Sequence, residues 1–172
     1  MKCTEVVYAR GHRNIRATHR TTLEITTDSD LTPRGDCIVG VSANKSAATL
    51  SAGFKECLQQ DDALLVVVLK AGGLRDFVVA TTSSKLLLTD PRKIIIRKSS
   101  YIEPATIGIY ANKSAGDIRR DLVEVLKDPQ MTLTVYLRVV SFDEIAPIDP
   151  SSRGVFNNEL QSLKSPSAKN LC

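Results

Sequence analysis

Apolar residues alternate with polar ones along much of the chain, and in two places the alternation gives way to a spacing of four. In the first of these, alternation over residues 39–41 is followed by three apolar residues spaced four apart, Leu50, Phe54 and Leu58. Alternation predicts a half-buried strand, and a spacing of four predicts a helix with one buried face. Alternation returns at residues 63–69, so the pattern predicts a strand, a helix over residues 46–60 and a second strand.

The second half of the chain repeats this pattern. The segment Ala-Asn-Lys-Ser-Ala that starts at Ala43 occurs again 68 residues later, starting at Ala111. At the same offset the apolar residues spaced four apart reappear as Ile118, Leu122 and Leu126. A second helix is therefore predicted over residues 114–128, with Ser114 and Asp117 as a capping box and Pro129 after its end.

A weaker likeness lies upstream at a different offset. Residues 17–26 resemble residues 80–89, which is a shift of 63 positions (from 17 to 80). Two units, at about 5–71 and 72–141, would each leave an apolar face uncovered, so we expect them to pair about a pseudo-twofold axis. The sequence thus predicts a mainly β fold with two helices, in which duplicated strand-helix-strand units form a β-barrel or a sandwich.

This β-rich domain is expected to occupy residues 1–145. Residues 146–172 are rich in Pro, Ser, Asn and Lys and show no periodicity, so they are predicted to form a tail that is flexible or draped on the surface. The 172 residues are 42% hydrophobic, which suffices for a buried core without a metal or a disulfide. The longest apolar run, residues 63–69, is too short to span a bilayer. No membrane role is expected, and the cytoplasm is the expected location.

The four cysteines are scattered through the chain at Cys3, Cys37, Cys57 and Cys172. No two of them form a C-x-x-C pair, so neither a zinc site nor a disulfide framework is predicted. We interpret Cys37 and Cys57 as small buried apolar groups. The 23 Lys and Arg residues exceed the 19 Asp and Glu residues, and the formal charge of +4 permits an anionic partner without requiring one.

The most cationic stretch lies at residues 10–22. It contains four arginines and both histidines of the chain but no acidic residue, whereas residues 74–85, its counterpart at the weaker offset, lack this set. The fold therefore does not require these side chains. On a regular strand Asn14, Arg16 and Arg20 share one face. Together with the neighbouring Arg13 they form either a solvated surface or a grip for a phosphate or carboxylate.

His12 and His19 are the candidates for acid–base chemistry. Alternation places His19 toward the interior and His12 on the arginine side, so the two imidazoles share a site only if the strand bends or bulges between them. For His19, a satisfied interior histidine is the alternative. Arg34 and Asp36 also lack counterparts in the second half. The Asp36 carboxylate either accepts hydrogen bonds from the backbone of a turn, or orients a histidine, or ligates a metal. Arg34 would add a further guanidinium to the arginines that could bind an anion.

Lys45 belongs to the repeated Ala-Asn-Lys-Ser-Ala segment. The presence of this segment in both halves favours a role in the fold, because Asn and Ser suit the turn and the cap that start a helix. The functional alternative is that Lys45, just before a helix N-terminus, helps to hold a phosphate.

Two strings resemble a known family. They are Gly-His-Arg-Asn-Ile-Arg-Ala-Thr-His-Arg-Thr-Thr-Leu-Glu-Ile from Gly11 and Leu-Thr-Pro-Arg-Gly-Asp-Cys-Ile-Val-Gly-Val from Leu31. They resemble the archaeal family DUF371, a domain of unknown function. The likeness covers about residues 5–140. It implies an uncharacterised archaeal cytoplasmic protein with a mainly β fold, and it carries over no catalytic residue.

The residues allow three kinds of function. The first is binding of a phosphate-bearing small ligand or nucleotide, held by Arg13, Asn14, Arg16, Arg20, Arg34 and Lys45. Aromatic residues are only 5% of the chain, so we expect a small ligand in preference to RNA stacked on a broad surface.

The second is a hydrolase or lyase, with or without a metal, whose catalytic groups are His12, His19 and Asp36. The third is a non-catalytic protein whose arginine strand meets an acidic partner or a second copy of the chain. The sequence identifies no cofactor.

Overall fold

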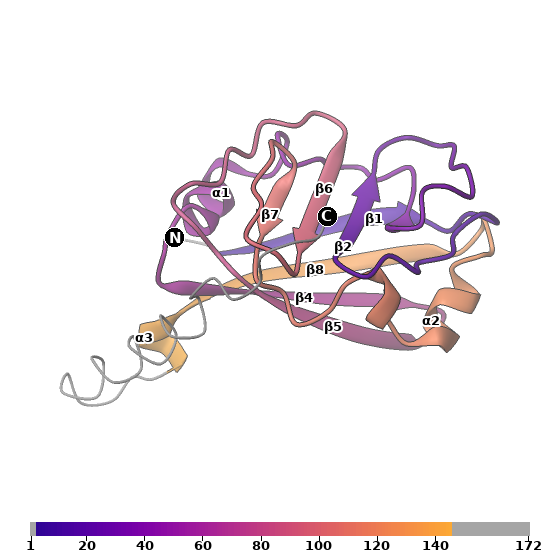
Figure 1. Ribbon diagram of the computed structural model, residues 1–172. Coiled ribbons are helices and arrows are strands. Elements are labelled where there is room, and N and C mark those ends of the chain that lie inside the picture. The colour runs from indigo at the N-terminus through magenta and orange to yellow at the C-terminus, as the bar shows by residue number, and fades with distance from the viewer. Residues whose placement is uncertain (1–2, 146–172) are drawn as a thin grey trace.

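The computed structural model describes residues 3–145, which form two four-stranded sheets stacked on one another (Figure 1). The first, sheet A, is antiparallel throughout, and its strands in spatial order are β1 (Thr4–Arg10), β8 (Thr132–Ser141), β4 (Ala63–Ala71) and β5 (Leu74–Thr81). The second, sheet B, has the spatial order β3 (Ile38–Gly40), β2 (Thr22–Thr26), β6 (Lys93–Arg97) and β7 (Thr106–Gly108). Its short outer strands run parallel to their inner neighbours.

The hydrophobic core lies between the two sheets. Along β4 every second side chain, including Leu65, Val67 and Leu69, is buried, and Leu23 and Ile25 of β2 belong to the same core. Alternation along the sequence therefore identified the inward face correctly, and the prediction of a mainly β fold is confirmed. The sheets do not close into a barrel. Within residues 3–145, the only backbone bridges outside the named strand pairs join Arg10 to Val41 and Thr81 to Ile109.

The helices are much shorter than the sequence predicted. They are α1 (Ala52–Leu58), the 3₁₀ turn η1 (Ala115–Asp117), α2 (Arg120–Val125) and α3 (Phe142–Ile145). In the first half, the backbone N–H groups of Ala47 and Ala48 donate to the carbonyls of Lys93 and Asp90 instead of to a helix. The helix consequently starts only at Ala52. The capping box of Ser114 and Asp117 is confirmed, but it caps η1 and not a long helix.

The order of three strands, a helix and a strand occurs twice, from β1 to β4 and from β5 to β8. The repeated Asn residues occupy matching places on the outer strands of sheet A. Tyr8 N donates to Asn44 Oδ1 and Val79 N donates to Asn112 Oδ1, at 2.9 and 2.8 Å. Each Asn backbone N–H bonds back to the carbonyl of the same strand residue. Asn therefore covers a sheet edge, and it does not cap a helix as the sequence had indicated.

The upstream pairing at a shift of 63 is wrong. Ala80 lies inside β5, whereas Ala17 lies in the connection after β1. The non-glycine residues of the described chain that have a left-handed conformation fall into two pairs: Ser42 and Tyr110, at the shift of 68, and Ala17 (φ 48°) and Leu88 (φ 54°), at a shift of 71 (from 17 to 88). In the order of elements, the connection over residues 82–92, between β5 and β6, thus occupies the place that residues 11–21 occupy between β1 and β2. That segment also lacks the arginine and histidine set, so the contrast between the halves survives the correction.

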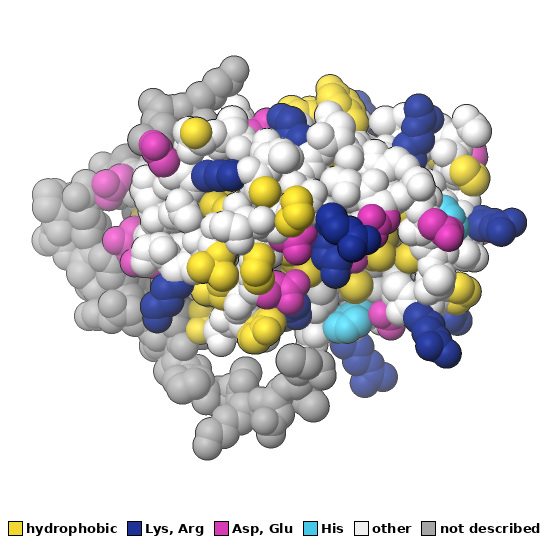
Figure 2. All heavy atoms as spheres, turned by 90° about the horizontal axis from the view of Figure 1, so that it is seen from above, with side chains coloured by type: hydrophobic (Ala, Val, Ile, Leu, Met, Phe, Trp, Pro, Cys, Tyr) yellow, Lys and Arg dark blue, Asp and Glu magenta, His cyan; other side chains and the backbone are white. Residues whose placement is uncertain are grey.

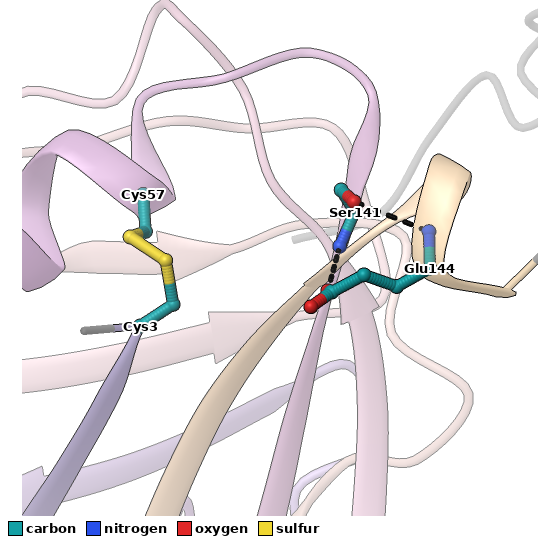
Figure 3. Close-up of a disulfide and its surroundings, with 4 residues drawn as sticks. All are labelled: Cys3, Cys57, Ser141 and Glu144. Carbon is teal, nitrogen blue, oxygen red and sulfur yellow. Dashed lines mark hydrogen bonds between the residues drawn. A yellow bond between two sulfur atoms is a disulfide. The ribbon is translucent and has the colours of Figure 1, made fainter. Parts of the chain in front are cut away.

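Cys3 and Cys57 form a disulfide that ties the start of β1 to α1 (Figure 3). The interpretation of Cys57 as a simple apolar group is wrong, because the fold brings two distant cysteines together that no sequence spacing connects. Cys37 is a free thiol, and Cys172 and the predicted tail over 146–172 lie outside the described residues. Within residues 3–145 no helix is both long and apolar enough to cross a membrane.

Candidate functional site

The cationic stretch forms the connection between β1 and β2, and we call residues 11–21 the arginine loop. Three other segments fix its backbone. His12 N donates to the carbonyl of Leu126 at 2.9 Å, Thr18 N donates to that of Asp36 at 2.9 Å, and the carbonyl of His19 accepts from Gly116 N at 2.8 Å. The loop is therefore held in one conformation by contacts near α2, before β3 and at η1.

Two residues of the arginine loop are restricted by this close packing. A Cβ atom at Gly11 would lie 2.1 Å from the carbonyl oxygen of Asp128, so only glycine fits there. Ala17 has φ 48°, and its carbonyl accepts a bond of 2.9 Å from Arg120 Nη1. Arg120 also bonds the carbonyls of Ala115 and Ile118, which couples the loop to η1. The scaffold thus constrains the backbone that carries the arginines.

The arginines of this region are exposed and have no side-chain partner among residues 3–145: Arg13, Arg16, Arg20 and Arg34. Three arginines elsewhere are paired with acids. Arg92 binds Asp28, Arg97 binds Glu103 and Arg119 binds Asp121. A guanidinium carries five N–H donors, so the four unpaired groups offer unused donor capacity to an anion. Figure 2 shows Lys and Arg side chains beside both histidines on one face of the molecule.

His12 has a structural contact that the second half reproduces with a different residue. Its Nδ1 accepts from Asn14 N at 3.0 Å, and in the second half Ser83 Oγ accepts from Lys85 N at 3.2 Å. The Nε2 atom of His12 lies 3.6 Å from Asp30 Oδ1, whose side chain is 93% exposed. Because Nδ1 is an acceptor, the neutral ring carries its proton on Nε2, as assigned from these bonds.

His19 also serves its own turn. Its Nδ1 accepts from Thr21 N at 3.2 Å and from Thr22 N at 3.1 Å. In the second half Asp90 Oδ1 accepts from Arg92 N and Lys93 N, at 2.7 and 2.9 Å. The His19 imidazole thus does the work that a carboxylate does at the matching place. These contacts agree with the alternative in which the hydrogen-bonding capacity of the His19 ring is used by the fold.

The structure does not gather the three catalytic candidates into one centre. The two histidines are separate side chains in Figure 2. Asp36 contributes its backbone carbonyl, which accepts from both Thr18 N and His19 N, and no bond to its carboxylate is recorded in the described chain. Within residues 3–145 no three His, Cys, Asp or Glu residues are grouped so that they could hold a metal. The described residues therefore show no ready-made metal site that includes His12, His19 and Asp36.

Of the remaining predicted ligand residues, Asn14 and Arg34 lie at the loop and Lys45 is engaged elsewhere. Asn14 Nδ2 donates to the carbonyl of Leu31 at 2.7 Å, which packs the segment carrying Arg34 against the arginine loop. Lys45 forms an ion pair with the buried carboxylate of Glu5. Burial acts to raise the pKa of Glu5, but the bonds from Lys45 and from Ser51 N outweigh it and hold that pKa below its usual value.

Comparison with known proteins identifies the family. Residues 7–140 match the model of the domain of unknown function DUF371. The chain belongs to this family. An uncharacterized protein of Methanocaldococcus jannaschii, MJ0206, is 44% identical over 123 residues, which cover 72% of this chain and 90% of that relative. The resemblance of the two sequence strings to DUF371 is thereby confirmed.

The DUF371 domain also contains buried polar groups that sequence reasoning missed. Glu24 of β2 is only 7% exposed. Because Glu24 lies between the apolar residues Leu23 and Ile25, the sequence pattern alone is typical of a side chain that faces solvent. Burial raises the pKa of Glu24, and Lys93, whose Nζ lies 3.8 Å from Glu24 Oε1, offsets part of this effect. Burial and the nearby Glu24 raise the pKa of Cys37 to about 12. Cys37 is therefore not a thiolate nucleophile at neutral pH.

A cavity of about 530 Å³ in the DUF371 domain lies beside the disulfide, and Gln60, Arg138 and Glu144 line part of it. Figure 3 shows Ser141 N donating to the carboxylate of Glu144 in this region. The Glu144 carboxylate therefore already accepts a hydrogen bond from the residue before α3. A second cavity, of about 490 Å³, is lined by hydroxyl groups of residues 81–84 and by Lys85. Its threonines donate to backbone carbonyls, so its hydroxyls largely serve the fold.

Proposed function

We propose that the arginine loop binds a phosphate-bearing small ligand such as a nucleotide. The observation that carries this proposal is a set of exposed arginines without side-chain partners in the described chain: Arg13, Arg16 and Arg20 on a loop whose backbone is fixed from three sides, and Arg34 on the segment that Asn14 holds against that loop. A preorganised set of guanidinium donors loses little freedom when an anion binds, and phosphate accepts paired N–H bonds from arginine in a favourable geometry.

The contacts of the histidines favour a binding role over acid–base catalysis. Both rings use Nδ1 to accept backbone N–H groups, and Ser83 and Asp90 make the same contacts in the second half. Only Nε2 remains available on each ring. His12 and His19 then position the loop, and Nε2 of His12 faces the carboxylate of Asp30.

We further propose that the two halves arose by duplication of one unit and that the first half alone acquired the anion site. The repeated element order and the matched contacts of Asn44 with Asn112 support this idea. The ion pairs of the repeated lysines also support duplication, because Lys45 binds Glu5 and Lys113 binds Asp76. On this account Lys45 supports the scaffold and contributes little to the ligand.

A thermal-shift screen of nucleotides and phosphorylated metabolites tests the binding proposal. A ligand at one hundred times its dissociation constant adds about 2.7 kcal/mol of stability, which raises the melting temperature by roughly 5–10 °C in a chain of this size. The double variant Arg16→Ala, Arg20→Ala is expected to melt like the wild type without ligand and to lose this shift.

The matched control is the double variant Lys85→Ala, Lys127→Ala, which removes the same charge from other surfaces. It should keep the full ligand shift. If no compound shifts the wild type, or if the arginine double variant keeps the shift, the proposal is wrong. Equal losses in both double variants would also contradict it, because they would indicate a response to net charge alone.

A further inference from the structure

No described element of residues 3–145 covers the outer face of sheet A, and every second residue of its four strands points to it. Sheet B covers only the opposite face (Figure 1). Three aromatic side chains on the outer face are well exposed: Tyr8 at 52%, Tyr136 at 44% and Phe77 at 54%. Aromatic residues are few in the whole chain, yet the fold concentrates three of them on one flat surface.

The strand register sets the spacing of these rings. Val6, Tyr136, Val68 and Phe77 lie opposite one another across the four strands, so they form one transverse row. Neighbouring strands are about 4.8 Å apart, which places the anchors of Tyr136 and Phe77 about 10 Å from each other. Tyr8 is the diagonal neighbour of Tyr136 on β1, at about 7–8 Å. The rings therefore form a line across the sheet.

Cations flank this row on both sides. No outward-facing position of the four strands carries an acid, although Glu144, after β8, lines the same cavity as Arg138. Lys70 and Arg75 lie opposite each other on one side of the row, and Arg138 lies on the other side. Arg10, at the end of β1, leads from this face into the arginine loop. None of the four has a side-chain partner among the described residues. The acids of the edge strands, Glu5 and Asp76, are only 8–9% exposed and bind Lys45 and Lys113.

We infer that the outer face of sheet A, carrying Tyr8, Tyr136 and Phe77, binds single-stranded nucleic acid. Bases of any sequence stack on aromatic faces, and the flanking cations neutralise the phosphates. A duplex does not expose its bases for such stacking, so a single strand is the matching form. A surface on which the charged strand residues are all cationic disfavours cationic partners. The inference concerns a different surface from the arginine loop and stands without the proposed function.

The inference is tested by fluorescence anisotropy of the full chain with a labelled single-stranded RNA of about 12 nucleotides, a length within the range of known single-strand sites. Loss of stacking in Tyr136→Ala is expected to weaken binding by about 5- to 150-fold. Tyr136→Phe keeps the aromatic face and should bind like the wild type. Tyr136→Leu keeps apolar area but has no aromatic face, and it should bind as weakly as Tyr136→Ala.

Salt dependence tests the cations. Four phosphate contacts predict that the logarithm of the affinity falls with the logarithm of the salt concentration with a slope of about −3, and Arg138→Ala should reduce that slope by about 0.7. Two controls lie off the face. Tyr101→Ala removes an equally exposed tyrosine that stacks on Arg97 of sheet B, and Lys85→Ala removes another unpaired lysine. Both should leave RNA affinity unchanged.

Three results would overturn the inference. The first is RNA binding that is absent or insensitive to Tyr136→Ala in a variant whose melting temperature matches the wild type. The second is equal affinity for a duplex of the same length. The third is RNA binding that Tyr136→Leu retains, which would show that the contact needs apolar area and not stacking on an aromatic face. Loss of RNA binding in the sheet variants with an intact nucleotide shift would leave the arginine-loop proposal untouched.

Discussion

At the scale of single residues, an imidazole in the first half and a carboxylate in the second half accept hydrogen bonds from matching backbone N–H groups. His19 Nδ1 and Asp90 Oδ1 each accept two backbone N–H groups at the start of an inner strand of sheet B. The sequence identified His19 as a candidate because it lies with His12 in a cationic stretch that the second half lacks, but it could not reveal this contact. The correct counterpart, Asp90, lies 71 positions later, and the weaker sequence likeness at 63 positions concealed it.

This equivalence predicts the effect of substitution at His19. His19→Ala leaves two N–H groups without their acceptor and should lower the free energy of unfolding by about 1–2 kcal/mol. His19→Asp restores an acceptor and should recover most of this loss. Urea unfolding of the two variants, with Asp90→Ala as the matched change in the second half, measures the difference. Equal destabilisation by Ala and Asp at position 19 would contradict the equivalence.

At the scale of elements, the sequence predicted the strands better than the helices. Alternation identified the inward faces of β4 and β8 because burial on one side of a sheet leaves a period of two. The helix starts were placed too early, because the backbone N–H groups of Ser51 and Arg119 are bound by Glu5 and Asp76 from neighbouring strands. Such long-range contacts carry no local sequence signature.

The candidate site remains a prediction. The cationic composition located the arginine loop, and the unpaired state of its arginines agrees with an anion site. The exposed rings of sheet A were missed, since a percentage of aromatic residues does not say which face they share. The register of β8 against β1 and β4 was needed to place Tyr136 between Val6 and Val68.

The repeated asparagines give a prediction at this scale. Asn44→Ala and Asn112→Ala each remove one acceptor from an edge strand and should lower the free energy of unfolding by about 0.5–1.5 kcal/mol. Hydrogen exchange should accelerate at the Tyr8 amide in the first variant and at the Val79 amide in the second. Asn→Asp keeps the acceptor oxygen and serves as the control. Unchanged exchange at both amides would show that these bonds do not form in solution.

At the scale of the whole molecule, two sheets share one core, and the disulfide links the start of β1 to α1 across 54 residues of sequence. Cross-linking distant positions restricts the unfolded chain. The cysteine pattern could not predict this pair, because its partners are neighbours only in the folded chain.

The disulfide should therefore contribute measurably to global stability. Cys57→Ser is expected to lower the free energy of unfolding by about 2–4 kcal/mol, and a reductant should have the same effect on the wild type. Cys37→Ser keeps the Cys3–Cys57 link and should remain sensitive to the reductant. A wild-type unfolding curve that is identical with and without reductant would contradict the role assigned to this bond.

The claim that unpaired arginines form an anion site is tested most directly by NMR of the arginine Nε–Hε groups during titration with adenosine triphosphate. The resonances of Arg13, Arg16, Arg20 and Arg34 should shift together and saturate. Those of Arg92 and Arg119, which are held by Asp28 and Asp121, should stay in place. Shifts that are absent from the arginine loop, or that are equally large at the paired arginines, would contradict the account.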